Sequence, residues 1–185
     1  AKIEPIKQAE TQRNFLTLEE LTKLAKTETD NLTMKNAALF SALTGLRYSD
    51  IEKLTWGEIE YIKGQGYFIR FRQQKTKGIE TLPISEQAYS FLGERKGDMD
   101  KVFTGLNDRD RYYHFPIWVG KAGITKDVTF HCLRHTFATL QLSHGTDIYT
   151  VSKMLGHREL KTTQVYAKII DQTKREAANK IKIDF

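Results

Sequence analysis

The sequence has little of what marks secreted, membrane or zinc-binding proteins. A single cysteine, Cys132, in 185 residues excludes an internal disulfide framework and argues against a thiolate zinc site. No stretch approaches the roughly 18 consecutive apolar residues of a membrane helix. The first residues also lack the charged, then apolar, then small-residue order of a signal peptide. We therefore expect a soluble protein of a reducing cell interior, with no membrane partner and no metal chemistry.

Positive charge is in modest excess. Twenty-nine Lys and Arg against 23 Asp and Glu give a formal net charge of +6, and the isoelectric point is near 9.3. Such a balance suits a polyanionic partner such as nucleic acid, although a solvated lysine-rich face would explain it equally well. With 39% apolar residues, the chain is long enough for one sizeable core and too short for several full domains.

The chain divides into a polar leading segment and one folded unit. Residues 1–16 carry Pro5 and no sustained period, which is typical of a linker. Thr17 and Glu20 form a capping-box pattern at the start of a leucine-rich helical repeat. We expect the folded unit to span residues 17–185, with a charged tail over 171–185.

Periodicity predicts a mainly α fold with one small antiparallel β-sheet, an α+β class. Alternating aromatic and apolar residues between Trp56 and Ser85 indicate the sheet, with turns at Gly64 to Gly66 and at Lys77-Gly78. Helical periods predict helices over 17–27, 31–44, 49–54, 85–94, 109–121, 131–143, 147–156 and 160–169. Gly45 and Gly145 are expected to end two of them.

His131 and Arg134 lie three residues apart at the start of a predicted helix, so their side chains project from nearly one face. A guanidinium binds two phosphate oxygens in a fork, and an imidazole exchanges a proton near neutral pH. Alone, the pair is equally typical of a polar surface edge. His135 is turned about a hundred degrees from Arg134 around the helix. We interpret it as a buried, hydrogen-bonded histidine, and Cys132 as a core residue.

Four segments together resemble the tyrosine recombinase, or phage integrase, family. They are TGLRYSDI, QQKTKG, HCLRHTFAT and LGHRELKTTQVYA. The family's catalytic set is Arg, Lys, His-x-x-Arg, a second His or Trp, and Tyr, in that order along the chain. The matching positions here are Arg47, Lys75, His131, Arg134, His157 and Tyr166. The resemblance covers the chain from about Thr17 to the tail, and QQKTKGIETLPIS is similar to integrases of bacterial mobile elements.

The resemblance implies a reaction that needs neither metal nor another cofactor. Arg47 and Arg134 would clamp the scissile phosphate and His157 would donate a third hydrogen bond. Tyr166 would attack, forming a 3′-phosphotyrosyl bond that stays reactive because a phenolate leaves more readily than an alkoxide. Lys75 would protonate the departing 5′-oxygen, and His131 would assist as a base toward the tyrosine.

The resemblance also implies partners. Double-stranded DNA at a recombination site is the expected ligand, bound by a homo-oligomer that would be a tetramer in the synapse, while the isolated domain would be a monomer. Residues 1–16 would be the linker from an N-terminal DNA-binding domain. Tail residues Ile181, Ile183 and Phe185 would anchor on a neighbouring protomer. The location implied is the bacterial cytoplasm, in association with the nucleoid.

Individual residues keep alternative interpretations. Arg47 is equally a helix-start surface residue, with Asp50 as its ion-pair partner; we interpret Asp50 as holding Arg47 in place. Lys77 competes with Lys75, because both point the same way in a strand. His157 follows Leu155-Gly156 and fits a helix C-terminal cap. The seven other tyrosines are interpreted as structural aromatics.

Three rival functions fit parts of the sequence. A type IB topoisomerase would use the same phosphate chemistry to relax supercoils without partner sites. A non-enzymatic regulator would use residues 147–169 as a helix-turn-helix, but would leave the six residues unexplained. A metal-dependent nuclease would need a cluster of carboxylates at ligand spacing, which the sequence lacks.

Overall fold

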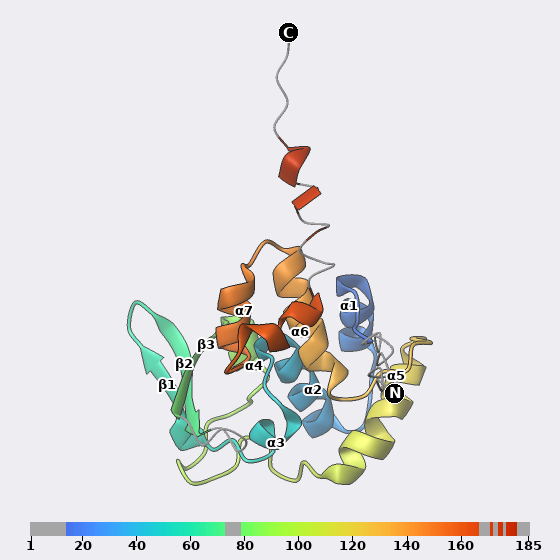
Figure 1. Ribbon diagram of the computed structural model, residues 1–185. Coiled ribbons are helices and arrows are strands. Elements are labelled where there is room, and N and C mark those ends of the chain that lie inside the picture. Colours follow the sequence, from blue (N-terminus) through green and yellow to red (C-terminus); the bar gives the residue numbers. More distant parts are fainter. Residues whose placement is uncertain (1–13, 73–78, 167–170, 172–173, 176, 181–185) are drawn as a thin grey trace, which may run out of the picture.

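A computed structural model describes residues 14–72, 79–166, 171, 174–175 and 177–180 (Figure 1). The helices in chain order are α1 (Leu18–Lys26), α2 (Leu32–Thr44), α3 (Tyr48–Ile51), α4 (Glu86–Ser90), α5 (Phe115–Lys121), α6 (Cys132–Ser143) and α7 (Ile148–Met154). The strands are β1 (Ile59–Ile62), β2 (Gly66–Arg72) and β3 (Ile79–Ile84). The predicted class, mainly α with a small antiparallel sheet, is confirmed.

Shorter helical turns complete the described part. A 3-10 turn, η1 (Trp56–Glu58), leads into β1, and a π-helical turn, η2 (Asp110–His114), runs directly into α5. Two 3-10 turns, η3 (Leu160–Thr162) and η4 (Gln164–Tyr166), follow α7. The continuous helix predicted from residue 160 is therefore wrong over its described residues, because backbone N–H groups there bond three residues back instead of four. No helix in the described ranges combines the length and apolar character that crossing a membrane requires.

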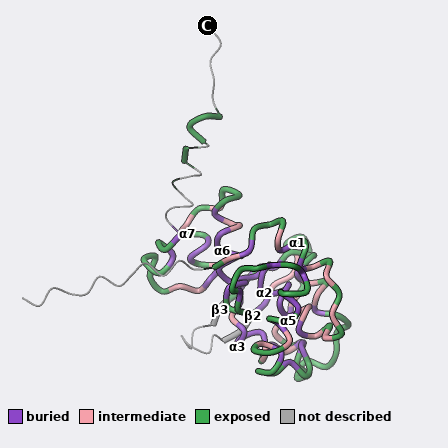
Figure 2. Tube along the Cα trace, turned by 90° about the vertical axis from the view of Figure 1, so that its right-hand side faces the viewer, coloured by how far each residue is buried: buried purple, intermediate pink, exposed green. Residues whose placement is uncertain are grey.

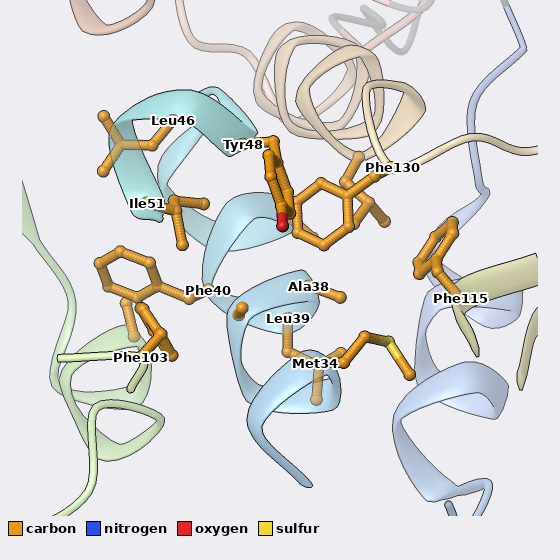
Figure 3. Packing of buried hydrophobic residues seen from close by; sticks show 14 of the residues in the cluster. Met34, Ala38, Leu39, Phe40, Leu46, Tyr48, Ile51, Phe103, Phe115 and Phe130 are labelled. Carbon is orange, nitrogen blue, oxygen red and sulfur yellow. The ribbon is translucent and has the colours of Figure 1, made fainter. Parts of the chain in front are cut away.

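Helix α2 is the centre of the core. Its positions Met34, Ala37, Ala38 and Phe40 are fully buried on different sides of the helix, as expected for a helix apolar all round. Aromatic rings from distant segments pack around it, and Phe40 lies 5.5 Å from Phe103 between ring centroids (Figure 3). Figure 2 shows the buried residues concentrated on the inner helices, with exposed residues on the outer turns.

The sheet is a meander with strand order β1-β2-β3, both pairs antiparallel. Ile59 pairs with Ile69, which pairs with Leu82, so one buried row crosses all three strands. This alternation explains why the pattern between Trp56 and Ser85 could be interpreted as a sheet. The predicted turn at Gly64 to Gly66 is confirmed, since both glycines have positive φ. The predicted Lys77-Gly78 turn lies outside the described residues.

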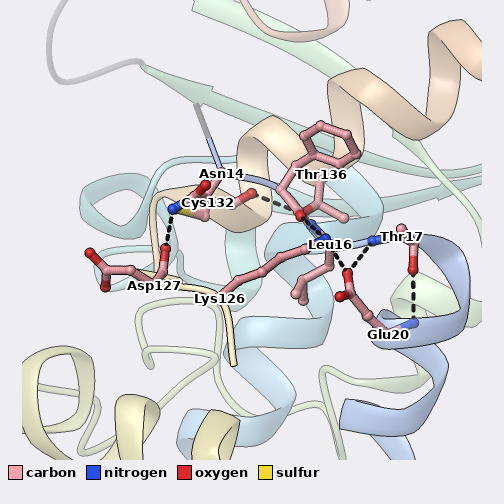
Figure 4. Close-up of polar contacts among 9 residues, drawn as sticks. Asn14, Leu16, Thr17, Glu20, Lys126, Asp127, Cys132 and Thr136 are labelled. Carbon is pink, nitrogen blue, oxygen red and sulfur yellow. Dashed lines mark hydrogen bonds and ion pairs between the residues drawn. The ribbon is translucent and has the colours of Figure 1, made fainter. Parts of the chain in front are cut away.

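The leading segment closes onto α6. The predicted capping box is confirmed, because Glu20 N–H donates to Thr17 Oγ1 at 3.2 Å and Thr17 N–H donates to Glu20 Oε2 at 2.8 Å. Leu16, the last residue of the expected linker, is fully buried, and its N–H donates to Thr136 Oγ1 at 2.9 Å (Figure 4). Thr136 in turn donates to Cys132 O within α6. The segment ahead of α1 is thus fixed to the middle of α6.

Candidate active site

Two histidines and an arginine lie at the N-terminus of helix α6. His131 stands at the N-cap position and is exposed, whereas Arg134 and His135 are only 5% and 8% exposed. Arg134 and His135 face into the protein, so α6 brings a buried cation and a buried imidazole to one place. The prediction that Cys132 is a core residue is confirmed.

Arg134 ties the ends of two other helices together. Its Nη1 donates to the carbonyl of Gly45 and its Nη2 to that of Leu155, both at 2.6 Å. Burial, and then the charge of Arg47, lower the pKa of Arg134 to about 10, so the guanidinium remains charged at neutral pH. Further N–H groups of the guanidinium remain for an anion. Arg134 therefore holds a fixed positive charge where α2, α6 and α7 meet.

Gly45 at the end of α2 has the left-handed conformation, with φ +73°. A Cβ there would lie 2.6 Å from Phe137 Cδ1 and 2.8 Å from Leu155 Cδ2. The prediction that Gly45 ends the helix is confirmed, and the contacts add a reason that the sequence did not reveal. The chain must approach α6 this closely for the Gly45 carbonyl to reach Arg134.

Replacing this glycine should therefore weaken the fold. For Gly45→Ala we expect the free energy of unfolding to fall by about 3 kcal/mol, from the left-handed backbone and the steric overlap together. Gly64→Ala is the matched control, since Gly64 has φ +82° but no atom within 4 Å of the added Cβ. Its cost should be about 1 kcal/mol. Urea denaturation measures both, and equal losses would contradict the close approach.

Arg47 begins the short helix α3 beside Arg134. Its Nη1 lies 3.9 Å from Asp50 Oδ2, which confirms the predicted pair. Arg47 is electrostatically coupled to Arg134, and Arg134 is coupled to Tyr166. The neighbouring Tyr48 is buried, and burial followed by the charge of Glu52 raises its pKa to about 12, which disfavours its phenolate.

Tyr166 lies in the last described 3-10 turn, and its side chain is 6% exposed. Its hydroxyl is hydrogen-bonded to His135 Nδ1 at 2.5 Å. The ring of His131 meets that of His135 edge-on, at 4.8 Å between centroids. The prediction that His135 is a buried, hydrogen-bonded histidine is confirmed, and its partner is the proposed nucleophile.

Two predicted site residues remain, His157 and Lys75. His157 is half-buried, and its Nδ1 is hydrogen-bonded to Thr163 Oγ1 at 2.8 Å. It follows Leu155, whose carbonyl holds Arg134, by two residues. Lys75, and its competitor Lys77, lie outside the described residues. The structure thus gathers Arg47, Arg134 and Tyr166 with the histidines of α6.

This cluster places cationic groups that can bind an anion beside a phenolic hydroxyl. Two guanidiniums can bind phosphate oxygens, and a phenol hydrogen-bonded to an imidazole can lose its proton as it attacks. Within the described ranges, no three His, Cys, Asp or Glu side chains gather in a way that could hold a metal ion.

His135 is the participant that sequence reasoning missed. It is turned away from Arg134 around the helix, but it shares a face with His131. Histidines four residues apart lie on one face of a helix, and this spacing could have indicated that the two act together. That Tyr166 would approach His135 from a separate turn is a tertiary fact with no sequence signal.

Comparison with known families gives an extended match. The sequence model of the phage integrase family matches residues 14–173. A tyrosine recombinase of Thermosipho africanus is 30% identical over 178 residues, covering 91% of this chain and 62% of that protein. Tyrosine recombinase XerA of Pyrococcus horikoshii is 33% identical over 178 residues, covering 91% and 61%. The chain therefore spans about six tenths of the length of these relatives.

Solved structures with the same fold include two recombinases. The crystal structure of XerA recombinase superposes with a TM-score of 0.74 at 26% identity, covering 98% of this chain and 68% of that one. The catalytic domain of bacteriophage HP1 integrase gives 0.65 at 26% identity, covering 90% of this chain and 94% of that domain. The second match extends over nearly all of a catalytic domain.

Proposed function

The chain belongs to the phage integrase family, and from this premise we propose that it cleaves and rejoins DNA strands in site-specific recombination. The reaction is a metal-free transesterification through a 3′-phosphotyrosyl intermediate. Residues 17–185 form the catalytic domain. The observation that carries the proposal is that Tyr166, from a separate turn, is hydrogen-bonded to His135 next to the buried Arg134, whose charge interacts with those of Arg47 and Tyr166.

The proposed roles follow from where the groups lie. Arg47 and Arg134 bind the nonbridging oxygens of the scissile phosphate, because both carry positive charge and lie close enough to interact electrostatically. His157 donates a further hydrogen bond, and its ring is held by Thr163. Tyr166 is the nucleophile. Lys75 protonates the 5′-oxygen, and His131 assists proton transfer at the tyrosine.

The proposed partner is double-stranded DNA at a recombination site, as the net charge of +6 favours. The acting form is a homotetramer in the synapse, into which this chain, a monomer by itself, assembles. Residues 1–16 connect to a DNA-binding domain, and 171–185 contact a neighbouring protomer. The DNA substrate is proposed to belong to a mobile element in a bacterial cell.

Covalent trapping from a pool of DNA sequences tests the proposed function. The chain is incubated at low salt, in EDTA, with nicked duplexes that carry a randomised window. Because the nick lets the cleaved end diffuse away, we expect an SDS-resistant protein–DNA adduct whose nucleotide maps to Tyr166 by mass spectrometry of the digest. Sequencing the trapped DNA gives the site. An adduct that EDTA abolishes, or none at all, contradicts the proposal.

A further inference from the structure

We propose that His135 is a catalytic residue whose Nδ1 accepts the proton of Tyr166 while the phenolic oxygen attacks the phosphate. The inference rests on the proposed function and deepens it by adding a seventh residue to the six that the sequence indicates. It also assigns the proton of the nucleophile to His135, where the resemblance assigns it to His131.

The first support is the position of the imidazole. A general base must lie within hydrogen-bond reach of the proton that it takes, about 2.6–3.2 Å between heavy atoms. The distance from His135 Nδ1 to Tyr166 Oη is 2.5 Å, slightly shorter than that range, so the two atoms are within hydrogen-bond reach. Both side chains are more than nine-tenths buried. Burial limits access of water to this proton and leaves the imidazole beside the reacting oxygen.

The second support is the rigidity of the helix around His135. Arg134, the residue before it, is fixed by two carbonyls. Thr136, the residue after it, donates to Cys132 O and accepts from Leu16 N–H. Both neighbours are therefore held by side-chain hydrogen bonds, so the stretch of backbone that carries the imidazole is fixed. A base that is already in position needs no rearrangement when the reaction occurs.

The third support is the charge around the pair. Arg134 interacts electrostatically with Tyr166 and favours a negatively charged oxygen there. The ring of the exposed His131 contacts that of His135 edge-on, and the His135 ring lies next to that of Tyr166. The three rings therefore form a row from the start of α6 to the tyrosine. Arg134 and His131 are thus two of the charged or titratable groups close to the transferred proton, and Arg47 and Asp50 act on Arg134 in turn.

The proton balance closes within the proposed site. His135 begins neutral, with its proton on Nε2 and the lone pair of Nδ1 toward Tyr166. As the Oη–P bond forms, the O–H bond breaks and an N–H bond forms at Nδ1. The P–O5′ bond breaks, and the 5′-oxygen takes a proton from Lys75. Rejoining reverses each step, since the 5′-hydroxyl returns its proton to Lys75 and His135 returns one to the departing tyrosine.

The test measures single-turnover adduct formation on the DNA that the wild-type chain cleaves. His135→Asn places an amide oxygen near the position of Nδ1, so it can accept a hydrogen bond from Tyr166 but cannot take its proton. We expect both His135→Asn and His135→Ala to be slower by about 10²-fold or more. His144→Asn makes the same change at the exposed end of α6 and should leave the rate unchanged. A His135→Asn rate within about threefold of wild type overturns proton acceptance.

A second substrate separates the nucleophile from the leaving group. Replacing the bridging 5′-oxygen by sulfur removes the need for an acid, because a thiol is far more acidic than an alcohol. Lys75→Ala should be slow on the oxygen substrate and recover on the sulfur substrate. The His135 variants should stay slow on both. Their recovery on sulfur would move the role of His135 to the leaving group and overturn the inference.

A measurement without DNA keeps the inference testable apart from the proposed function. In the full chain labelled with ¹⁵N-histidine, we expect His135 to be the tautomer protonated at Nε2, with an Nδ1 resonance that shifts in Tyr166→Phe. A proton on Nδ1 in the neutral ring overturns the inference. An Nδ1 resonance that does not shift in Tyr166→Phe also overturns it. Failure of the wild-type chain to form any adduct contradicts the proposed function instead. The NMR measurement still determines the tautomer of His135 in that case.

Discussion

Tyr166→Phe should form no SDS-resistant adduct with DNA that traps the wild-type chain. The substitution removes only the hydroxyl that forms the phosphotyrosyl bond, and loss of a nucleophile costs on the order of 10⁶-fold in other enzymes. The phenyl ring keeps its packing against Phe137, Val151 and Leu155. Adduct yield on nicked duplexes in EDTA, resolved on denaturing gels, measures the effect.

Folding and DNA binding should survive this change. The variant loses the hydrogen bond to His135, which predicts a loss of about 1 kcal/mol in the free energy of unfolding. Gel-shift affinity should stay near that of the wild-type chain, because Arg47 and Arg134, the proposed phosphate-binding residues, are intact. Tyr149→Phe, at an exposed tyrosine of α7, is the matched control and should cleave normally. An adduct that persists in Tyr166→Phe would place the nucleophile elsewhere.

Arg134→Ala should lose both activity and stability. Removing one donor to a developing anion costs about 10²–10³-fold in rate. The carbonyls of Gly45 and Leu155 also lose their partner, and each unsatisfied buried group costs about 1–3 kcal/mol. We expect the free energy of unfolding to fall by about 3 kcal/mol. Single-turnover cleavage and urea denaturation measure the two losses on one preparation.

Arg47→Ala separates the two roles. The ion pair from Arg47 to Asp50 spans 3.9 Å, and the side chains of Arg47 and Asp50 are 22% and 3% exposed. Because the buried Asp50 keeps its electrostatic attraction to Arg134, removal of Arg47 should cost about 1–2 kcal/mol. Cleavage should still fall by about 10²-fold or more, because one phosphate donor is gone. A stability loss in Arg47→Ala equal to that of Arg134→Ala would show that the two carbonyl contacts of Arg134 contribute little.

Local signals explain why most of the fold could be predicted. The start of α1 follows from Thr17 and Glu20, which satisfy each other's backbone N–H groups. The end of α2 follows from Gly45, which takes the left-handed conformation at its C-cap. The prediction of secondary structure was poorer where backbone hydrogen bonds of different spacing compete. Thr162 and Thr163 donate backbone hydrogen bonds three residues back, which makes 3-10 turns where periodicity alone predicts a helix.

The site was predictable in its residue types and less so in its contacts. Arg47 with Asp50 lies within one short helix, so spacing was enough to pair them. The contact of His135 with Tyr166 joins residues 31 apart, and that of Arg134 with Gly45 joins residues 89 apart. Such contacts depend on how the helices pack. Spacing along the chain therefore indicated that α6 carries the site, but not which side chain meets the tyrosine.

The bond from Leu16 to Thr136 has a consequence for how the protein is made. The two residues are 120 apart, and at roughly 5–20 residues per second a ribosome needs about 6–24 s to add that length. During that time the Leu16 N–H has no access to Thr136, and α2 lacks α6, one of the helices that pack against it. His131, Arg134 and His135 are added in the same stretch of synthesis as Thr136. The segment ahead of α1 and helix α6 thus reach their final places together, after α6 has been synthesised.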